Sequence, residues 1–185
     1  MTSATPFAAK PVLTGARAVL RPFTEDDAEV MAVIIEDPEV VRFTGGPASF
    51  GAERLRAWYG SRSDQDDRLD LAVTDRVTGE LVGEVVLNEW DPDHRHATFR
   101  TLIGPRGRGR GVGTEAARLI VGYGFETAGL HRIGLEAYAD NHRARHVYEK
   151  IGFTVEGVRR QVELHDGVWR DEVVMGLLAE EWRAR

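Results

Sequence analysis

The residues best suited to chemistry form one segment rich in glycine and arginine, Gly104 to Thr114, with the sequence GPRGRGRGVGT. Glycines let a backbone approach a ligand closely, and the N–H groups at a helix start carry about half a positive charge. Arginine side chains add charge-assisted hydrogen bonds to phosphate oxygens. Since a predicted strand precedes the segment and a predicted helix follows it, the segment predicts a phosphate or pyrophosphate site.

Several kinds of site compete for this segment, and spacing separates them. A Walker loop needs a lysine, and the segment has none, so nucleoside triphosphate hydrolysis is excluded. A dinucleotide fingerprint fits Gly111 to Ala116 with Glu136 as the ribose acid, but about seven residues separate it from the strand end at Ile103, which disfavours a nicotinamide-dependent oxidoreductase. A flexible surface turn that touches RNA is disfavoured by the flanking strand and helix.

A third pattern, Arg-x-x-Gly-x-Gly, fits Arg108 to Gly113, with Thr114-Glu115-Ala116 behind it. Further along, Asn141 and Ala144 open a second predicted helix, which carries the sequence VYEKIGF from Val147 to Phe153. With these motifs in this order, the chain resembles the GNAT superfamily of acetyl-CoA-dependent N-acetyltransferases from about Val12 to Trp182. The sequence His165 to Asp171 is similar to a hairpin of the branch that holds ribosomal-protein N-terminal and spermidine acetyltransferases.

The resemblance implies acetyl-CoA as co-substrate and no metal. It places the pyrophosphate on the main-chain N–H groups of the glycine loop. It places the pantetheine arm along Thr101-Leu102-Ile103, where a main-chain N–H polarises the thioester carbonyl. The residues that it assigns to acetyl-CoA are Leu102, Ile103, Arg108, Gly109, Arg110, Gly111, Val112, Gly113, Thr114, Asn141, Ala144, Arg145 and Tyr148.

Acetyl transfer to an amine needs a neutral amine, a donor to the developing oxyanion and an acid for the departing thiolate. The resemblance assigns the acid to Tyr148, and a phenol with a pKa of about 10 is protonated at neutral pH. Because Tyr148 also recurs with Ala144, Val147 and Ile151 at helical spacing, a packing role is the alternative.

The general base is where the chain departs from the family it resembles. Many relatives in the ribosomal-protein branch carry an acid at the position of Thr98, and a threonine cannot deprotonate an ammonium. Glu89 is the preferred base, because strand alternation places it on the face of Val85 and Leu87, whereas Glu84 points to the opposite face. A chain of water molecules, or a surface glutamate without a role, is left as the alternative.

Two histidine pairs raise the question of a metal. His142 and His146 have the spacing of a helical zinc pair, but Arg143 stands where a metalloprotease has its glutamate. His94 and His96 share a strand face without a third ligand. We expect solvated histidines and no metal site.

The elements that position these residues follow a mixed order. Hydrophobic spacing and turn signals predict helices at about 24–36, 51–59, 113–127 and 141–150. They predict strands at 16–21, 69–74, 80–90, 94–103, 131–138, 153–164 and 168–177, and a turn at Gly45-Gly46-Pro47. This order predicts an α/β (α+β) fold, GNAT-like, with a mixed and mostly antiparallel sheet of about seven strands and about four helices.

Length and composition set the outer bounds. With 185 residues, 42% hydrophobic and 29% charged, the chain predicts one domain over 15–185 after a loose tail of 1–14. Cysteine is absent, no apolar stretch approaches the roughly 20 residues of a membrane span, and the net charge of −6 disfavours nucleic acid. We therefore expect a cytoplasmic protein with neither nucleic-acid nor membrane partners.

The sequence thus favours an N-acetyltransferase that moves an acetyl group from acetyl-CoA to a primary amine by direct attack in a ternary complex. The alternative is a non-catalytic module of the same fold that binds acyl-CoA or another small ligand. Thr98 favours this alternative, and Tyr148 favours the enzyme. The acceptor is a small-molecule amine or a protein N-terminus. The acidic stretch 64–70 attracts cations or is a solvated loop, and homodimer formation is left open.

Overall fold

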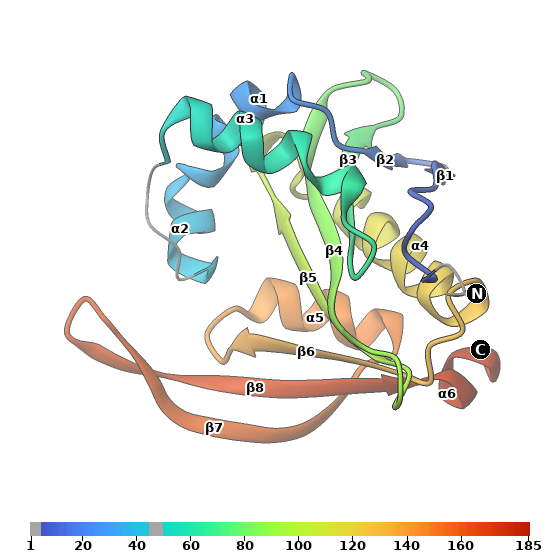
Figure 1. The fold of residues 1–185 in the computed structure, drawn as a ribbon. Coiled ribbons are helices and arrows are strands. Elements are labelled where there is room, and N and C mark those ends of the chain that lie inside the picture. The colour runs from blue at the N-terminus through green and yellow to red at the C-terminus, as the bar shows by residue number, and fades with distance from the viewer. Residues whose placement is uncertain (1–4, 45–49) are drawn as a thin grey trace.

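The computed structural model describes residues 5–44 and 50–185. In this part of the chain eight strands form one sheet in the order β1-β2-β3-β4-β5-β6-β8-β7, with six α-helices around it (Figure 1). The strands are β1 (Leu13–Thr14), β2 (Ala18–Pro22), β3 (Leu69–Asp75), β4 (Leu81–Asp91), β5 (His96–Ile103), β6 (Arg132–Tyr138), β7 (Thr154–His165) and β8 (Val168–Leu178). The helices are α1 (Asp27–Ile35), α2 (Pro38–Thr44), α3 (Ala52–Gly60), α4 (Val112–Glu126), α5 (His142–Ile151) and α6 (Ala179–Arg183).

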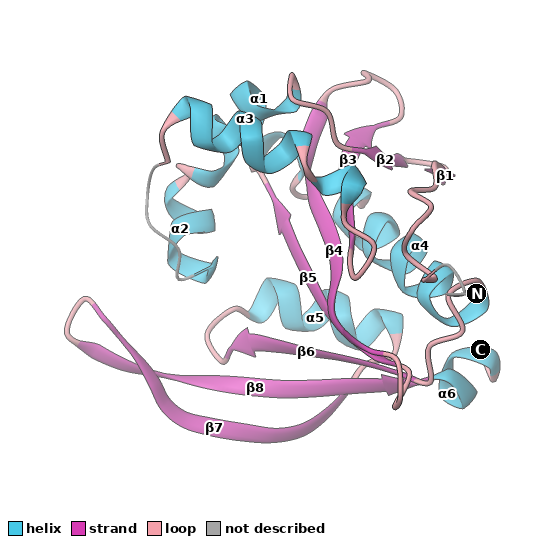
Figure 2. Ribbon diagram, viewed as in Figure 1, coloured by secondary structure: helices cyan, strands magenta, loops and turns pink. Residues whose placement is uncertain are grey.

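The predicted mixed, mostly antiparallel sheet is confirmed, and Figure 2 shows how the helices surround it. The structure adds the short elements β1, α2 and α6 to the seven strands and four helices expected from periodicity. A strand of two residues and helices of five and seven residues are too short to show a hydrophobic period, so periodicity does not predict them. The turn predicted at Gly45-Gly46-Pro47 lies outside the described residues.

The sheet separates two apolar cores. One core, on the α4–α5 face, contains Leu71, Val85, Phe99 and Ile133 of the sheet. The other core, on the α1–α3 face, is smaller and contains Ala72 of β3. Since side chains alternate along a strand, each sheet residue can be assigned to one of these faces from the pairing register.

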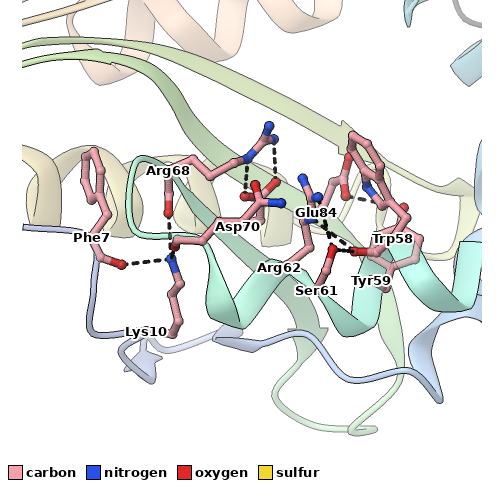
Figure 3. A network of polar contacts seen from close by, with 10 residues as sticks. Phe7, Lys10, Trp58, Tyr59, Ser61, Arg62, Arg68, Asp70 and Glu84 are labelled. Carbon is pink, nitrogen blue, oxygen red and sulfur yellow. Dashed lines mark hydrogen bonds and ion pairs between the residues drawn. The ribbon is translucent and has the colours of Figure 1, made fainter. Parts of the chain in front are cut away.

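Residues 5–14 are packed, which differs from the loose tail predicted over 1–14. Phe7 is fully buried and its ring lies edge-on to Trp90, with 5.8 Å between centroids. Leu13–Thr14 pairs with β2. The Lys10 ammonium donates to the carbonyl of Phe7 at 2.8 Å and to that of Arg68 at 2.6 Å (Figure 3). One aromatic and one lysine anchor the segment, and such isolated anchors leave no periodic signal.

A polar network lies beneath α3, on the α1–α3 face (Figure 3). Arg68 forms a two-pronged ion pair with Asp70, at 2.6 and 2.7 Å. The hydroxyl of Tyr59 lies 3.5 Å from a carboxylate oxygen of Glu84. Burial, together with the negative charge of Asp70, raises the pKa of Glu84 to about 7. Glu84 is therefore a titrating group inside the protein.

Candidate active site

A break in the sheet creates the site. β5 and β6 run parallel but pair over only three residues, and the last pair is Thr98 with Gly134. Beyond it the strands diverge, as Figure 1 shows, with α5 behind the gap. A cavity of about 910 Å³ lies there, and its lining includes residues of the glycine loop, both diverging strands, α2 and α5.

The divergence exposes main-chain groups of β5. The N–H of Gly104 donates to the carbonyl of Val82 at 2.8 Å, so the antiparallel register turns the N–H of Leu102 toward β4 as well. The intervening residues Thr101 and Ile103 turn their N–H groups away from β4, toward the gap. Leu102 therefore offers the cavity its side chain only, whereas Thr101 and Ile103 offer donors.

The glycine loop lines one end of the cavity. Gly109 and Gly111 have φ angles of 71° and 77°, in the left-handed region that glycine adopts without strain. A Cβ on Gly113 would lie 3.1 Å from a side-chain carbon of Ile103. The lining of the cavity includes Gly107, Arg108, Gly109, Gly111, Gly113 and Thr114. Successive main-chain N–H groups at the start of α4 are thus available for an anion.

The arginines of the loop bind carboxylates of the protein itself. The pairs are Arg106 with Glu80 at 2.6 Å, Arg108 with Asp37 at 2.5 Å and Arg110 with Asp75 at 2.7 Å. Their expected role as additional phosphate ligands therefore competes with these ion pairs. Of the three, only Arg108 lines the cavity. The partner acids lie 26 to 71 residues away in sequence, so spacing gave no sign of them.

Two more residues assigned to acetyl-CoA have side chains that do not line the cavity. Val112 is 2% exposed and belongs to the core. Arg145 donates to the carbonyl of Ala139 at 3.0 Å. Neither side chain lines the cavity, and the assignment of both residues to acetyl-CoA stays a prediction.

The start of α5 lies at the cavity. The Asn141 side chain accepts a hydrogen bond from the N–H of Ala144 at 3.2 Å and so caps the helix, and both residues line the cavity. Tyr148, one turn further, also lines it while its ring packs edge-on against Phe99 and Phe153, with centroids 5.9 and 6.1 Å away. Burial raises the pKa of Tyr148 to about 12. Packing and access to the cavity are therefore both present.

Glu89 reaches the cavity by a route that alternation did not predict. The β4–β5 register shifts between Asn88 and Asp91, and Glu89 has a φ of 52°. This bulge turns its carboxylate to Thr98, whose hydroxyl donates to it at 2.8 Å. Thr98 pairs with Asn88, which strand alternation places on the α1–α3 face, opposite Val85 and Leu87. The Glu89 carboxylate, which binds Thr98, therefore lies on the α1–α3 face, and its expected position beside Val85 and Leu87 was wrong.

Three further carboxylates line the cavity, and the sequence did not indicate a role for them in acetyl transfer. They are Glu39 of α2, Glu136 of β6 and Glu172 of β8. Glu39 binds Arg143 at 2.7 Å, Glu172 binds Arg159 at 3.1 Å, and Glu136 also binds Arg159. Within residues 5–44 and 50–185, Glu89 is the cavity carboxylate without an arginine partner. Glu84 does not line the cavity.

No group of three or more histidine, aspartate or glutamate side chains within residues 5–44 and 50–185 is arranged to hold a metal ion. His94 binds Asp91 at 2.8 Å, and burial, with the nearby Arg132, lowers the pKa of His96. None of the described helices has the length and apolar character needed to cross a membrane.

Comparison with known proteins places this geometry in a family. The acetyltransferase (GNAT) domain family matches residues 17–154. A spermidine N(1)-acetyltransferase of Escherichia coli K12 is 30% identical over 166 residues, 89% of this chain and 88% of that protein. The "Putative ribosomal N-acetyltransferase" of Bacillus subtilis is 35% identical over 104 residues, 56% of this chain and 57% of that protein.

Solved structures support the same assignment for the fold. Spermidine N-acetyltransferase from Vibrio cholerae, in complex with CoA and spermine, has a TM-score of 0.83 at 23% identity and covers 91% of this chain and 99% of that chain. A GCN5-related N-acetyltransferase from Brucella melitensis has a TM-score of 0.79, with coverage of 95% and 82%. The chain therefore belongs to the GNAT family of acetyltransferases, enzymes that use acetyl-CoA.

Proposed function

We propose that this protein transfers the acetyl group of acetyl-CoA directly to a primary amine while both are bound in the cavity between β5 and β6. The observation that carries the proposal is the divergence of these strands, because one cavity then reaches the glycine loop, Tyr148 and Glu89. The glycine loop and Tyr148 approach from α4 and α5, whereas Glu89 serves the opposite face. Cofactor and acceptor thus have separate sides of one space.

The cofactor is proposed to lie along β5. The N–H groups between Arg108 and Gly113 bind the pyrophosphate at the start of α4. The N–H groups of Thr101 and Ile103 face the gap and bind the pantetheine arm as a neighbouring strand would. One of them polarises the thioester carbonyl, which stabilises the developing oxyanion.

The chemical step uses two side chains. The amine nitrogen attacks the thioester carbonyl carbon, and the proton that nitrogen loses goes to the Glu89 carboxylate. Thr98 orients that carboxylate through its hydroxyl, at 2.8 Å. The carbon–sulfur bond then breaks, and the departing thiolate takes the proton of the Tyr148 hydroxyl. Protonated Glu89 and ionised Tyr148 return to their resting forms by exchange with water.

A small aliphatic amine carries the positive charge that this cavity favours. Glu89 lines the cavity without an arginine partner among residues 5–44 and 50–185, and the net charge of −6 attracts cations. Spermidine appears in the names of several relatives, and a ribosomal substrate in that of another. We propose a polyamine-type primary amine as acceptor, in a cytoplasmic enzyme that needs neither metal nor nucleic acid.

The test is acetyl-CoA-dependent thiol release with spermidine, diamines and N-terminal peptides, with products identified by mass spectrometry. We expect intersecting steady-state lines and no acetylated enzyme after incubation with acetyl-CoA alone, since transfer is direct. Glu89→Gln should lower kcat by roughly 10²–10⁴-fold at neutral pH, as expected for loss of a general base. Glu84→Gln is the matched control and should keep the activity. A fully active Glu89→Gln enzyme would exclude Glu89 as the base.

A further inference from the structure

Arg170 of β8 is a buried charge that the proposed chemistry does not use. Its side chain is 6% exposed. One guanidinium nitrogen donates to the main-chain carbonyl of Arg42 at 2.7 Å and to the Glu163 carboxylate at 3.0 Å. The other donates to the Asp140 carboxylate at 2.8 Å. Arg170 therefore links α2, the end of β6 and the β7–β8 hairpin, which are far apart in sequence.

The same guanidinium lies against two aromatic rings. Its central carbon is 3.8 Å from the ring centroid of Tyr138 and 5.4 Å from that of Phe43. Both rings line the cavity, whereas Arg170 does not. The guanidinium thus supports two wall residues from outside the cavity, and cation–π attraction strengthens that support.

These walls belong to the acceptor side. Along β6, Ile133, Leu135 and Ala137 enter the core on the α4–α5 face, so alternation turns Tyr138 to the opposite face. Glu89 and Thr98 serve that opposite face too. Phe43 comes from α2, whose Val40 belongs to the core of the α1–α3 face.

Polar contacts hold α2 in place. Val40 is its one buried residue among those described. Glu39 near its start binds Arg143, and Arg42 near its end binds Asp140 at 2.9 Å, the same carboxylate that Arg170 binds. A planar guanidinium can serve three acceptors and two rings at once, which the single ammonium of lysine cannot do.

We propose that Arg170 is a positioning residue that fixes Phe43 and Tyr138 and thereby sets the size of the acceptor end of the cavity. This inference rests on the proposed function for its kinetic consequence. Loss of the guanidinium releases the end of α2 and widens the space between the two rings. Acceptor affinity and the discrimination between slender and bulky amines then fall, while acetyl-CoA binding at the glycine loop stays as it was.

The first test is independent of activity. Hydrogen exchange of the α2 amides should be faster in Arg170→Lys than in the wild type, with the α4 amides unchanged. Arg132→Lys is the matched control, because Arg132 forms an ion pair with Glu156 and does not line the cavity. Unchanged exchange in α2 would overturn the proposal whether or not the amine substrate is identified.

The second test is a split of kinetic constants with spermidine, 1,3-diaminopropane and an N-terminal hexapeptide. For Arg170→Lys we expect the acceptor KM to rise about 10- to 100-fold, as expected for a loss of binding that is equal in the ground state and the transition state. The Kd of acetyl-CoA should stay the same and kcat should change little. Phe43→Leu, which trims the wall with Arg170 intact, should reduce the same discrimination. An unchanged acceptor KM, or equal losses in kcat and cofactor affinity, would overturn the proposal.

Discussion

Replacement of Tyr148 by phenylalanine separates catalysis from packing. The tyrosine ring is 7% exposed and lies edge-on to Phe99 and Phe153, contacts that a phenylalanine keeps. Its hydroxyl has no hydrogen-bond partner among the described residues. Loss of the hydroxyl should therefore change the free energy of unfolding by less than about 1 kcal/mol.

The expected catalytic loss is much larger. A thiol of pKa about 8.5 and the Tyr148 phenol, whose pKa burial raises to about 12, differ enough that full proton transfer from the phenol to the thiolate costs about 5 kcal/mol. Burial in the same cavity also raises the pKa of the thiol, so the difference between the two pKa values becomes smaller. We expect kcat to fall roughly 10²–10⁴-fold in Tyr148→Phe with an unchanged Kd for acetyl-CoA, because the interaction forms only as the thiolate departs.

The assay is steady-state thiol release with spermidine between pH 6 and 10, together with calorimetric titration of acetyl-CoA. Tyr148 should add no alkaline limb in this range, because its pKa is about 12. Tyr123→Phe makes the same change at a tyrosine whose hydroxyl lies 3.4 Å from the carbonyl of Pro6, and it should keep the wild-type rate. A Tyr148→Phe enzyme with the wild-type kcat would show that Tyr148 only packs.

Two further substitutions test the glycine loop and the Glu84 carboxyl. Gly109→Ala should weaken acetyl-CoA binding at least about 10-fold by calorimetry, because its methyl group enters the cofactor's space. Gly79→Ala is the control, since Gly79 has a similar φ, 74° against 71°, and equally open surroundings. An equal loss of acetyl-CoA affinity in both variants would contradict the proposed loop contact. The pKa of Glu84 is raised to about 7, so the native state holds its proton longer than the unfolded state and stability falls as pH rises from about 4.5 to 7. Between pH 5 and pH 8, the free energy of unfolding measured in urea should fall by up to about 3 kcal/mol less in Glu84→Gln than in the wild type. An equal fall in the two proteins would refute this.

The glycine loop and α5 could be predicted from sequence because their signals are local. Left-handed φ angles at Gly109 and Gly111 favour glycine in any fold. Asn141 caps α5 through a group three residues away. Periodicity over ten or more residues likewise indicated α4 and the long strands.

What the sequence did not show depends on residues far apart or on a single backbone angle. Pro38 begins α2, since proline is favoured at a first helical position, but a helix of seven residues is too short to show a hydrophobic period. The partner of Arg108 is Asp37, 71 residues away. The face of Glu89 depends on a bulge that composition does not encode.

Because β5 and β6 pair over only three residues, binding of the cofactor between them should stabilise the folded state. The three-residue ladder leaves two strand edges inside the sheet, and on the proposed binding mode acetyl-CoA occupies one of them. A ligand that binds only the native state adds about 2.7 kcal/mol of stability at a concentration of 100 times its Kd. Since unfolded chains are those that proteases remove, the steady-state amount of this enzyme in a cell should then follow the supply of its own co-substrate.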